Sequence, residues 1–151
     1  MSTEQNKKVV LRWREEIWNK RNVNIIDELH APDYVGHYSG IPGPIRGREA
    51  LKQLFATYLA AFGIRVTPEF LIAEGDMVVV HDTNWLKHTG AFQGIPPTGK
   101  ELSLTSTDIY RIVNGKIQSF NCYPSGTVIF AQLGVLSNIE AAIAASSTTR
   151  T

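Results

Sequence analysis

The first third of the chain has its apolar residues at helical spacing. Between Asn6 and Lys20 they lie three and four positions apart, which predicts one helix with an apolar stripe that covers a sheet. The stripe consists of Val9, Val10, Trp13, Ile17 and Trp18. A short second helix is predicted from the N-cap Asn24 through His30, because the pair Ala31-Pro32 disfavours helix.

The same spacing returns from Arg48 to Phe62, after a loop at residues 41–47, and Gly63 is interpreted as the C-terminal stop of this third helix. Beyond it, β-branched and alternating runs predict four strands. They span Ile64–Ala73, Met77–His88, Glu101–Ile112 and Lys116–Tyr123. Asn114-Gly115 between the last two runs is a strong hairpin signal.

Helices followed by an antiparallel meander predict an α+β fold, in which helices cover one face of a curved sheet and the resulting cup encloses a pocket. Residues 137–151 are rich in Ala, Ser and Thr, and we expect a flexible tail there, with a loose helix over Ile139–Ala145 at most. The predicted division is therefore one domain over residues 1–136 and a tail over 137–151.

Composition narrows the choice of partners. With 15 basic and 14 acidic residues among 151, the chain has no charge excess that would attract nucleic acid or an anionic membrane. The single cysteine, Cys122, excludes an internal disulfide and is interpreted as a small strand hydrophobe, and the Cys/His spacing does not fit a zinc site. The N-terminus lacks the apolar run of a signal peptide, so a cytoplasmic protein is expected.

Three stretches resemble the SnoaL-like polyketide cyclase family of the NTF2-like superfamily. They are GPIRGREALKQLFATYLAAF (43–62), IAEGDMVVVHDTNWLKHTGAFQGIPPTGK (72–100) and TDIYRIVNGKIQSF (107–120), which runs on to AQLG (131–134). The resemblance covers about residues 8–134. It implies a cone-shaped α+β barrel, with a curved antiparallel sheet wrapped by N-terminal helices, that is frequently a homodimer and works without metal or organic cofactor.

Founding members of this family close a polyketide ring by intramolecular aldol condensation. That chemistry needs a base that removes a proton next to a carbonyl and donors that stabilise the enolate. Relatives on the same scaffold carry out hydroxylation, isomerisation or binding alone, so the fold does not fix the reaction.

Two histidines match family positions. His88, in the stretch Lys87-His88-Thr89-Gly90, is expected to be a pocket acid, base or donor, and the alternative is a histidine satisfied by the adjacent loop. His37 follows the second helix and either lines the mouth of the cone or belongs to a loop. Tyr34 and Tyr38 beside it are expected as pocket wall, where each hydroxyl can hold a substrate oxygen.

The last strand departs from the family pattern. The positions of the family's glutamate, tryptophan and catalytic aspartate hold Ser119, Asn121 and Ser125, which are all neutral. Simple alternation places these residues and Tyr123 on the face that the family turns toward its ligand. A serine without a partner base cannot deprotonate a carbon near neutral pH, so the aldol mechanism does not transfer directly.

Asp82 is the candidate that could replace the family's aspartate as the base, because it lies six residues before His88 on the same strand face. If that face is interior, Asp82 has a raised pKa and is suited to acid or base work; otherwise it is a solvated strand residue. Asp108 is expected to form a structural pair with Arg111. The remaining aromatic residues are assigned as follows: Trp13 and Trp18 to packing, and Trp85, Phe92 and Phe120 to either core or pocket wall.

The leading hypothesis is an enzyme that acts on a small polyketide- or terpenoid-like molecule as an aldol or ester cyclase, an isomerase or a hydroxylase. His88 would transfer protons with help from Asp82 or His37, while Asn121 and Ser125 hold a carbonyl oxygen. Ser119, Tyr34, Tyr38 and Trp85 would complete the substrate site. The alternative is a non-catalytic protein that kept the cavity, bound a small apolar molecule and lost the base.

Overall fold

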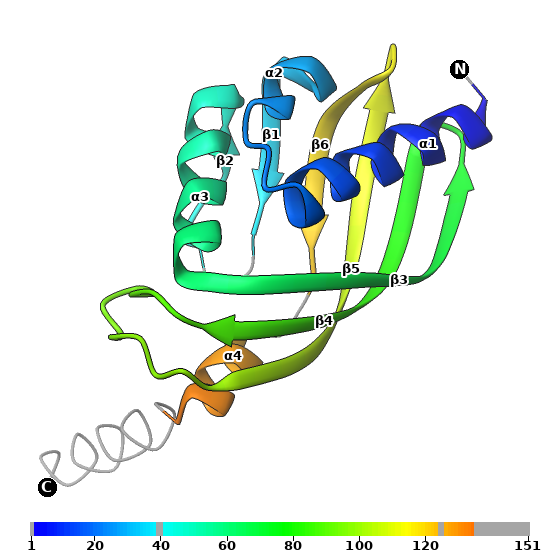
Figure 1. Cartoon of the computed structure of the whole chain (residues 1–151). Coiled ribbons are helices and arrows are strands. Elements are labelled where there is room, and N and C mark those ends of the chain that lie inside the picture. Colours follow the sequence, from blue (N-terminus) through cyan, green and yellow to red (C-terminus); the bar gives the residue numbers. More distant parts are fainter. Residues whose placement is uncertain (1, 39–40, 124–125, 135–151) are drawn as a thin grey trace, which may run out of the picture.

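In the computed structural model, helices pack along the concave side of one curved sheet (Figure 1). The structure describes residues 2–38, 41–123 and 126–134, and of residues 126–128 the backbone alone. The predicted tail at 137–151, its loose helix and the domain boundary at residue 136 lie outside the described residues.

The first helix, α1 (Thr3–Arg14), begins at a capping box, in which the Ser2 hydroxyl accepts from the Gln5 backbone N–H and the Gln5 side chain accepts from the Ser2 N–H. It continues without a break into a π-helix, η1 (Glu15–Asn19), where the Lys20 N–H donates to the Glu15 carbonyl at 3.1 Å. The predicted apolar stripe is confirmed, since Val10, Trp13 and Ile17 are almost completely buried.

Two strands that the sequence pattern did not indicate lie between residues 30 and 46. Helix α2 (Ile25–Leu29) stops one residue earlier than predicted, and His30 already begins β1 (His30–His37). The loop at residues 41–47 contains the short β2 (Ile45–Arg46). Helix α3 (Gly47–Ala61) buries Leu51, Phe55 and Leu59. Gly63 does not end α3, because the chain is already extended at Phe62.

The remaining strands follow the prediction closely and build most of the sheet. They are β3 (Phe62–Glu74), β4 (Met77–His88), β5 (Glu101–Val113) and β6 (Lys116–Cys122), and α4 (Gly126–Leu133) comes after them. The strand order is β2-β1-β6-β5-β4-β3, antiparallel except for the β1–β6 pair, which is parallel. The sheet is curved and unclosed, so the fold is the predicted α+β cone with an open side.

Strand β4 shows which face of the sheet is interior. Every second residue from Val78 to His88 is buried, including Asp82, and the residues between them are exposed or half-buried. Of the two alternatives for Asp82, the interior one therefore holds. Side chains of this face meet those of α1 and α3 in the main hydrophobic core.

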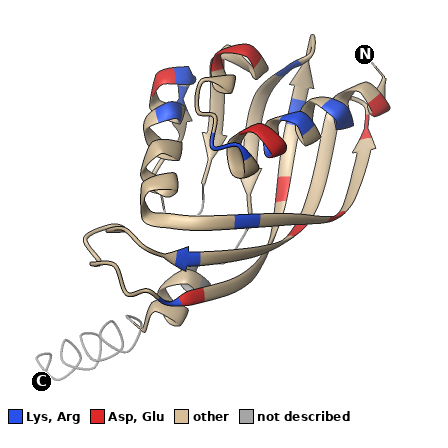
Figure 2. Ribbon diagram, viewed as in Figure 1, with Lys and Arg blue, Asp and Glu red and all other residues tan. Residues whose placement is uncertain are grey.

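Charged residues of both signs occupy the helices on the outside of the cone (Figure 2). Arg12 of α1 binds Glu28 of α2 at 2.6 Å, and Lys52 of α3 binds Asp27 of α2 at 2.7 Å. These exposed pairs join the three helices at their solvent side but contribute little stability individually. Among the described residues, no helix has the length and apolarity needed to cross a bilayer.

Candidate active site

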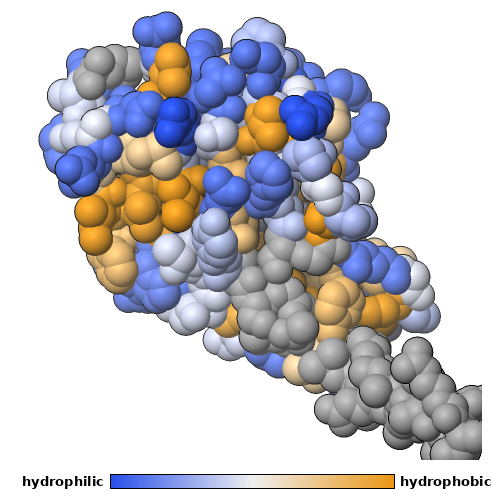
Figure 3. Space-filling view, turned by 180° about the vertical axis from the view of Figure 1, so that it is seen from behind, coloured by the Kyte–Doolittle hydropathy of each residue, from blue (hydrophilic) through white to orange (hydrophobic). Residues whose placement is uncertain are grey.

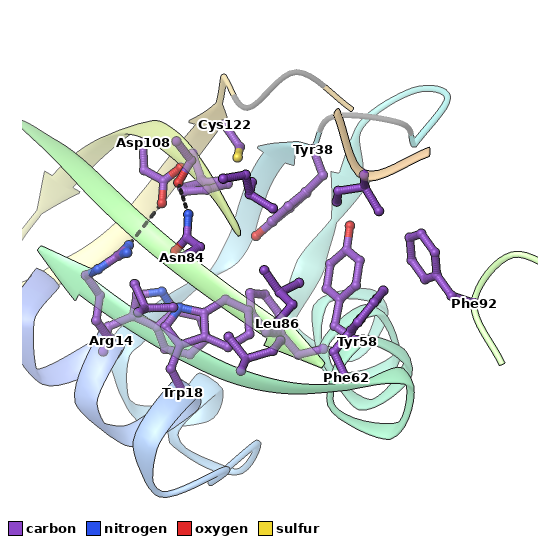
Figure 4. A pocket seen from close by; sticks show the side chains of 18 of the residues that line it. Arg14, Trp18, Tyr38, Tyr58, Phe62, Asn84, Leu86, Phe92, Asp108 and Cys122 are labelled. Atoms are coloured by element: carbon purple, nitrogen blue, oxygen red, sulfur yellow. Dashed lines mark hydrogen bonds and ion pairs between the residues drawn. The ribbon is translucent and has the colours of Figure 1, made fainter. Parts of the chain in front are cut away.

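A pocket with a volume of about 140 Å³ lies between the concave face of the sheet and the helices (Figure 4). This is room for roughly ten water-sized groups. Its walls are mostly apolar and aromatic, with a few polar side chains. The residues that line the pocket include Trp13, Arg14, Trp18, His30, Tyr34, Tyr38, Tyr58, Asn84, Phe92, Ser106, Asp108, Phe120 and Cys122.

Two tryptophans from the N-terminal helical segment form part of the wall. Trp13 and Trp18 both pack against Phe55 of α3, with ring centroids 5.1 and 5.2 Å away. Residues five apart on an α-helix point about 140° away from each other. The wider π-helical turn of η1 reduces this angle, so Trp18 reaches the same pocket as Trp13. The interpretation of both residues as packing alone was incomplete.

At one end of the pocket, Arg14 of α1 binds two buried carboxylates on neighbouring strands. Its Nη1 donates to Oδ2 of Asp108 at 3.0 Å and to the Tyr110 hydroxyl at 2.8 Å, and its Nη2 donates to Asp82. Arg14, Asp82 and Asp108 are exposed by 5%, 0% and 7%, so the whole cluster is shielded from water. We call Arg14, Asp82 and Asp108 the charge cluster.

With both carboxylates ionised, the charge cluster carries one net negative charge. Burial raises the pKa of Asp82 to about 6, with Arg14 opposing this shift and the charge of Asp108 adding to it. One oxygen of each carboxylate, Oδ1, is buried and has no hydrogen-bond partner among the described residues. The cluster therefore has a free acceptor position and becomes neutral when it takes up one proton.

Arg14 is a site residue that the sequence pattern did not indicate, and Asp108 has another partner than the one predicted. Arg14 lies four residues after Val10 and three before Ile17, which places a cation on the buried stripe of α1. A cation on an otherwise apolar stripe was the signal in the sequence that could have identified Arg14. Arg111, the expected partner of Asp108, instead lies on the outside, where its Nε is 3.7 Å from Asp76.

Neutral polar groups line the rest of the pocket. The hydroxyls of Tyr34 and Tyr38 are 2.8 Å apart, and Asn84 donates to the Ser106 hydroxyl at 2.8 Å. Burial, together with the charge of Arg48, lowers the pKa of His30 to about 3, so this wall residue is neutral near pH 7. The sequence analysis assigned no pocket role to His30.

His88 is buried but is not part of the pocket lining. Its Nδ1 accepts from the Thr98 backbone N–H at 3.2 Å and lies 2.9 Å from the Thr98 hydroxyl. The adjacent loop thus binds Nδ1 of His88, as the alternative expected, whereas the buried Nε2 has no hydrogen-bond partner among the described residues. Six residues along a strand cover about 20 Å, so His88 and Asp82 do not meet although they share a face.

His37 and Trp85 point away from the pocket. His37 is exposed and lies on the opposite face of β1 from Tyr34 and Tyr38, which do line the pocket. Trp85 lies on the outer face of β4, where the guanidinium of Arg65 covers its ring at 4.3 Å.

The prediction for the inward face of the last strand was wrong. Gln118 is an extra residue in β6, since Ile112 pairs with Ile117 but Arg111 pairs with Ser119. This bulge reverses the alternation, so that Phe120 and Cys122 line the pocket while Ser119 and Asn121 do not. Ser125 lies outside the described residues.

Cys122 lies directly opposite Asp108 in the β5–β6 ladder. Burial, and then the charge of Asp108, raise the pKa of its thiol, which is therefore neutral near pH 7. Within residues 2–38, 41–123 and 126–134, no three His, Cys, Asp or Glu side chains are grouped to hold a metal ion.

Comparison with known proteins identifies similar sequences and folds. A family model, SnoaL-like polyketide cyclase, matches residues 8–133. Nogalonic acid methyl ester cyclase of Streptomyces nogalater is 29% identical over 119 residues, which cover 78% of this chain and 89% of that protein.

Solved structures match nearly the whole chain. IdmH of Streptomyces antibioticus is 27% identical with a TM-score of 0.73, over 87% of this chain and 99% of its own. AclR of Streptomyces galilaeus is 25% identical with a TM-score of 0.76, over 88% and 98%. A SnoaL-like protein of Jannaschia sp. CCS1 shares the fold with a TM-score of 0.80 at 21% identity, over 86% and 92%.

Proposed function

Because the chain belongs to the SnoaL-like polyketide cyclase family, we propose that it is a cyclase-type enzyme that removes a proton next to a carbonyl of a small, mainly apolar, polyketide-like molecule. The observation that carries the proposal is the charge cluster at the end of an otherwise aromatic pocket. This reaction class is shared by ring-closing condensation and double-bond isomerisation.

Asp108 is the proposed base. It lines the pocket, its Oδ2 is held by Arg14, and its Oδ1 has no partner among the described side chains. Asp82 does not line the pocket and acts behind Arg14, where its charge offsets that of the guanidinium.

The alternative of a non-catalytic binding protein rested on the neutral residues of the last strand. Asp108 of β5 weakens that argument, because it presents a carboxylate to the same pocket from the neighbouring strand. Ligand binding without turnover remains the outcome that would favour this alternative.

The proposal can be tested without knowing the natural substrate. We expect the protein to catalyse hydrogen–deuterium exchange at the carbon next to the carbonyl of 1-tetralone, a bicyclic ketone, in deuterated buffer, followed by NMR. Asp108→Asn should slow the exchange by about 10²–10⁴-fold, the usual effect of removing a general base. Asp76→Asn is the matched control, because Asp76 is in a half-exposed pair on the outside.

Equal exchange rates for the wild type and Asp108→Asn would rule out Asp108 as the base. Tight binding of 1-tetralone with no exchange above the buffer rate would favour the non-catalytic alternative. Circular dichroism of each variant separates loss of the base from loss of the fold.

We also propose that the protein forms a homodimer through the outer face of the sheet. Ile72, Val79 and Ile109 lie side by side across three strands on that face. Ile72 is 60% exposed and the neighbouring Phe70 49% exposed. Figure 3, the view from behind the sheet, shows apolar surface gathered in this way. Contiguous exposed apolar surface of this kind is typical of interaction sites.

A further inference from the structure

We propose that the hydroxyl pair of Tyr34 and Tyr38 binds the carbonyl oxygen of the substrate and stabilises it as the enolate forms, and that Gly36 between them makes the pair possible. This inference rests on the proposed function, for which it names the electrophilic partner of Asp108. Both tyrosines line the pocket, and Figure 4 shows the hydroxyl end of Tyr38 directed into it.

Gly36 is the residue that allows the two rings to meet. Tyr34, Gly36 and Tyr38 occupy alternate positions, so all three lie on the inner face at β1. A Cβ at residue 36 would contact the Tyr34 hydroxyl far inside van der Waals distance and would lie 2.8 Å from Cε2 of Tyr38. The absent side chain is thus the space through which the Tyr34 hydroxyl reaches that of Tyr38.

The pair has one proton more than its own hydrogen bond uses. Two hydroxyls 2.8 Å apart share one hydrogen bond, which leaves the other O–H free to donate. Tyr34 is only 1% exposed, whereas Tyr38 is half-buried, so Tyr38 is the residue that presents this donor. A hydroxyl that itself accepts a hydrogen bond is a stronger donor, and Tyr34 thereby supports Tyr38.

Both tyrosines remain donors across the physiological pH range. Burial raises the pKa of Tyr34 and of Tyr38 above the ordinary value of a phenol. A group that stays protonated cannot act as the base. It can stabilise negative charge that develops on a substrate oxygen.

The pair and the base reach the pocket from different strands of the sheet. Gly36 pairs with Phe120 of β6, and Cys122, two residues further, pairs with Asp108 of β5. Strand β1, which Tyr38 directly follows, is therefore two strands from β5, which carries Asp108, or about 10 Å between backbones. Cys122 of the strand between them also lines the pocket.

The step balances with these groups alone. The C–H bond next to the carbonyl breaks, its proton passes to the Asp108 carboxylate, and its electron pair forms the C=C bond of the enolate. The carbonyl π electrons move to the oxygen, whose negative charge the Tyr38 hydroxyl stabilises by a hydrogen bond. The proton of Tyr38 stays on Tyr38.

The experiment compares 1-tetralone with tetralin, the same bicycle without oxygen, by calorimetry on wild type and Tyr38→Phe. We expect Tyr38→Phe to weaken 1-tetralone binding about fivefold and to leave tetralin binding unchanged, because one neutral hydrogen bond is lost. The infrared carbonyl band of bound 1-tetralone should move to higher frequency in the variant. Hydrogen–deuterium exchange at the carbon next to the carbonyl of 1-tetralone should slow by about a hundredfold or more in Tyr38→Phe.

Tyr123→Phe is the matched control, since Tyr123 is 64% exposed. Gly36→Ala should move the infrared carbonyl band of bound 1-tetralone to higher frequency, as Tyr38→Phe does. If Gly36→Ala does not fold, Tyr38→Phe alone tests the inference. An unchanged carbonyl band in Tyr38→Phe, or equal weakening of both ligands, would overturn the inference. Neither result touches the proposed base, which the Asp108→Asn exchange rate tests separately.

Discussion

Asp82 and Asp108 both bind Arg14, yet their surroundings give them different tasks. Asp108 reaches the pocket, while Asp82 is completely enclosed behind the guanidinium. The sequence placed Asp82 on the same face as His88, because strand alternation is regular over β4, but left open whether that face is interior. It did not indicate the partner, since Arg14 comes from a helix 68 residues away in the chain.

The charge cluster predicts the pH dependence of the reaction. As the pH falls through about 6, Asp82 takes up a proton and no longer offsets the charge of Arg14, so hydrogen–deuterium exchange of 1-tetralone should slow. Asp82→Asn removes the group that titrates near pH 6. The step in the rate profile near pH 6 should then disappear and the plateau rate should fall; an unchanged profile would contradict this.

The free energy of unfolding should change with pH in the opposite direction to the reaction rate. The pKa of Asp82 is raised on folding, so the native state binds more protons than the unfolded state between about pH 4 and pH 6. The contribution of Asp82 to stability is therefore complete below pH 4 and is lost as the pH rises through 6. Urea denaturation of wild type and Asp82→Asn across this range measures the difference.

At the scale of elements, regular periodicity predicted most of the structure, and two local irregularities determined the pocket. The helical spacing identified α1 and α3, and alternation identified β4, β5 and β6 almost to the residue. Strand β1 was missed because Pro32 and Gly36 interrupt its β pattern. The π-helical turn of η1 and the bulge at Gln118 are departures from the periods on which such predictions depend.

Two tryptophans allow a matched test of the role of η1. Trp18 lines the pocket through the π-helical turn, whereas Trp85 is on the outer face of β4. Trp18→Ala should weaken tetralin binding about tenfold, or roughly 1.4 kcal/mol, because an aromatic wall is lost. Trp85→Ala should leave the affinity unchanged. Calorimetry measures both, and equal effects of the two substitutions would show that Trp18 does not contact the ligand.

At the scale of the whole molecule, the unclosed sheet has one face that forms the pocket and one face on which no helix of the described residues packs. The sequence predicted the cone and its helical cover through both periodicity and family resemblance. It could not show the apolar row on the outer face, because Ile72, Val79 and Ile109 become neighbours only through strand register.

The proposed homodimer predicts a simple change in mass. Ile72→Lys places a charge in the centre of the outer apolar row and should convert the dimer to a monomer, because the charge loses its hydration when the faces pair. Sedimentation velocity of the wild type and the variant measures this. Lys8→Glu, a charge change at an exposed position of α1 on the other side of the sheet, is the control. A monomeric wild type would refute the proposal.

The bulge at Gln118 and the π-helical turn of η1 have a consequence for how this protein tolerates evolutionary change. Each amounts to one inserted residue, and each shifts the phase of everything that follows it in its element. A single-residue deletion at Gln118 would remove the bulge and leave Phe120 and Cys122 at the wall, because both follow strict alternation from Ile117 when Gln118 is not counted. These two irregularities therefore absorb a change of one residue in chain length without changing which side chains line the pocket.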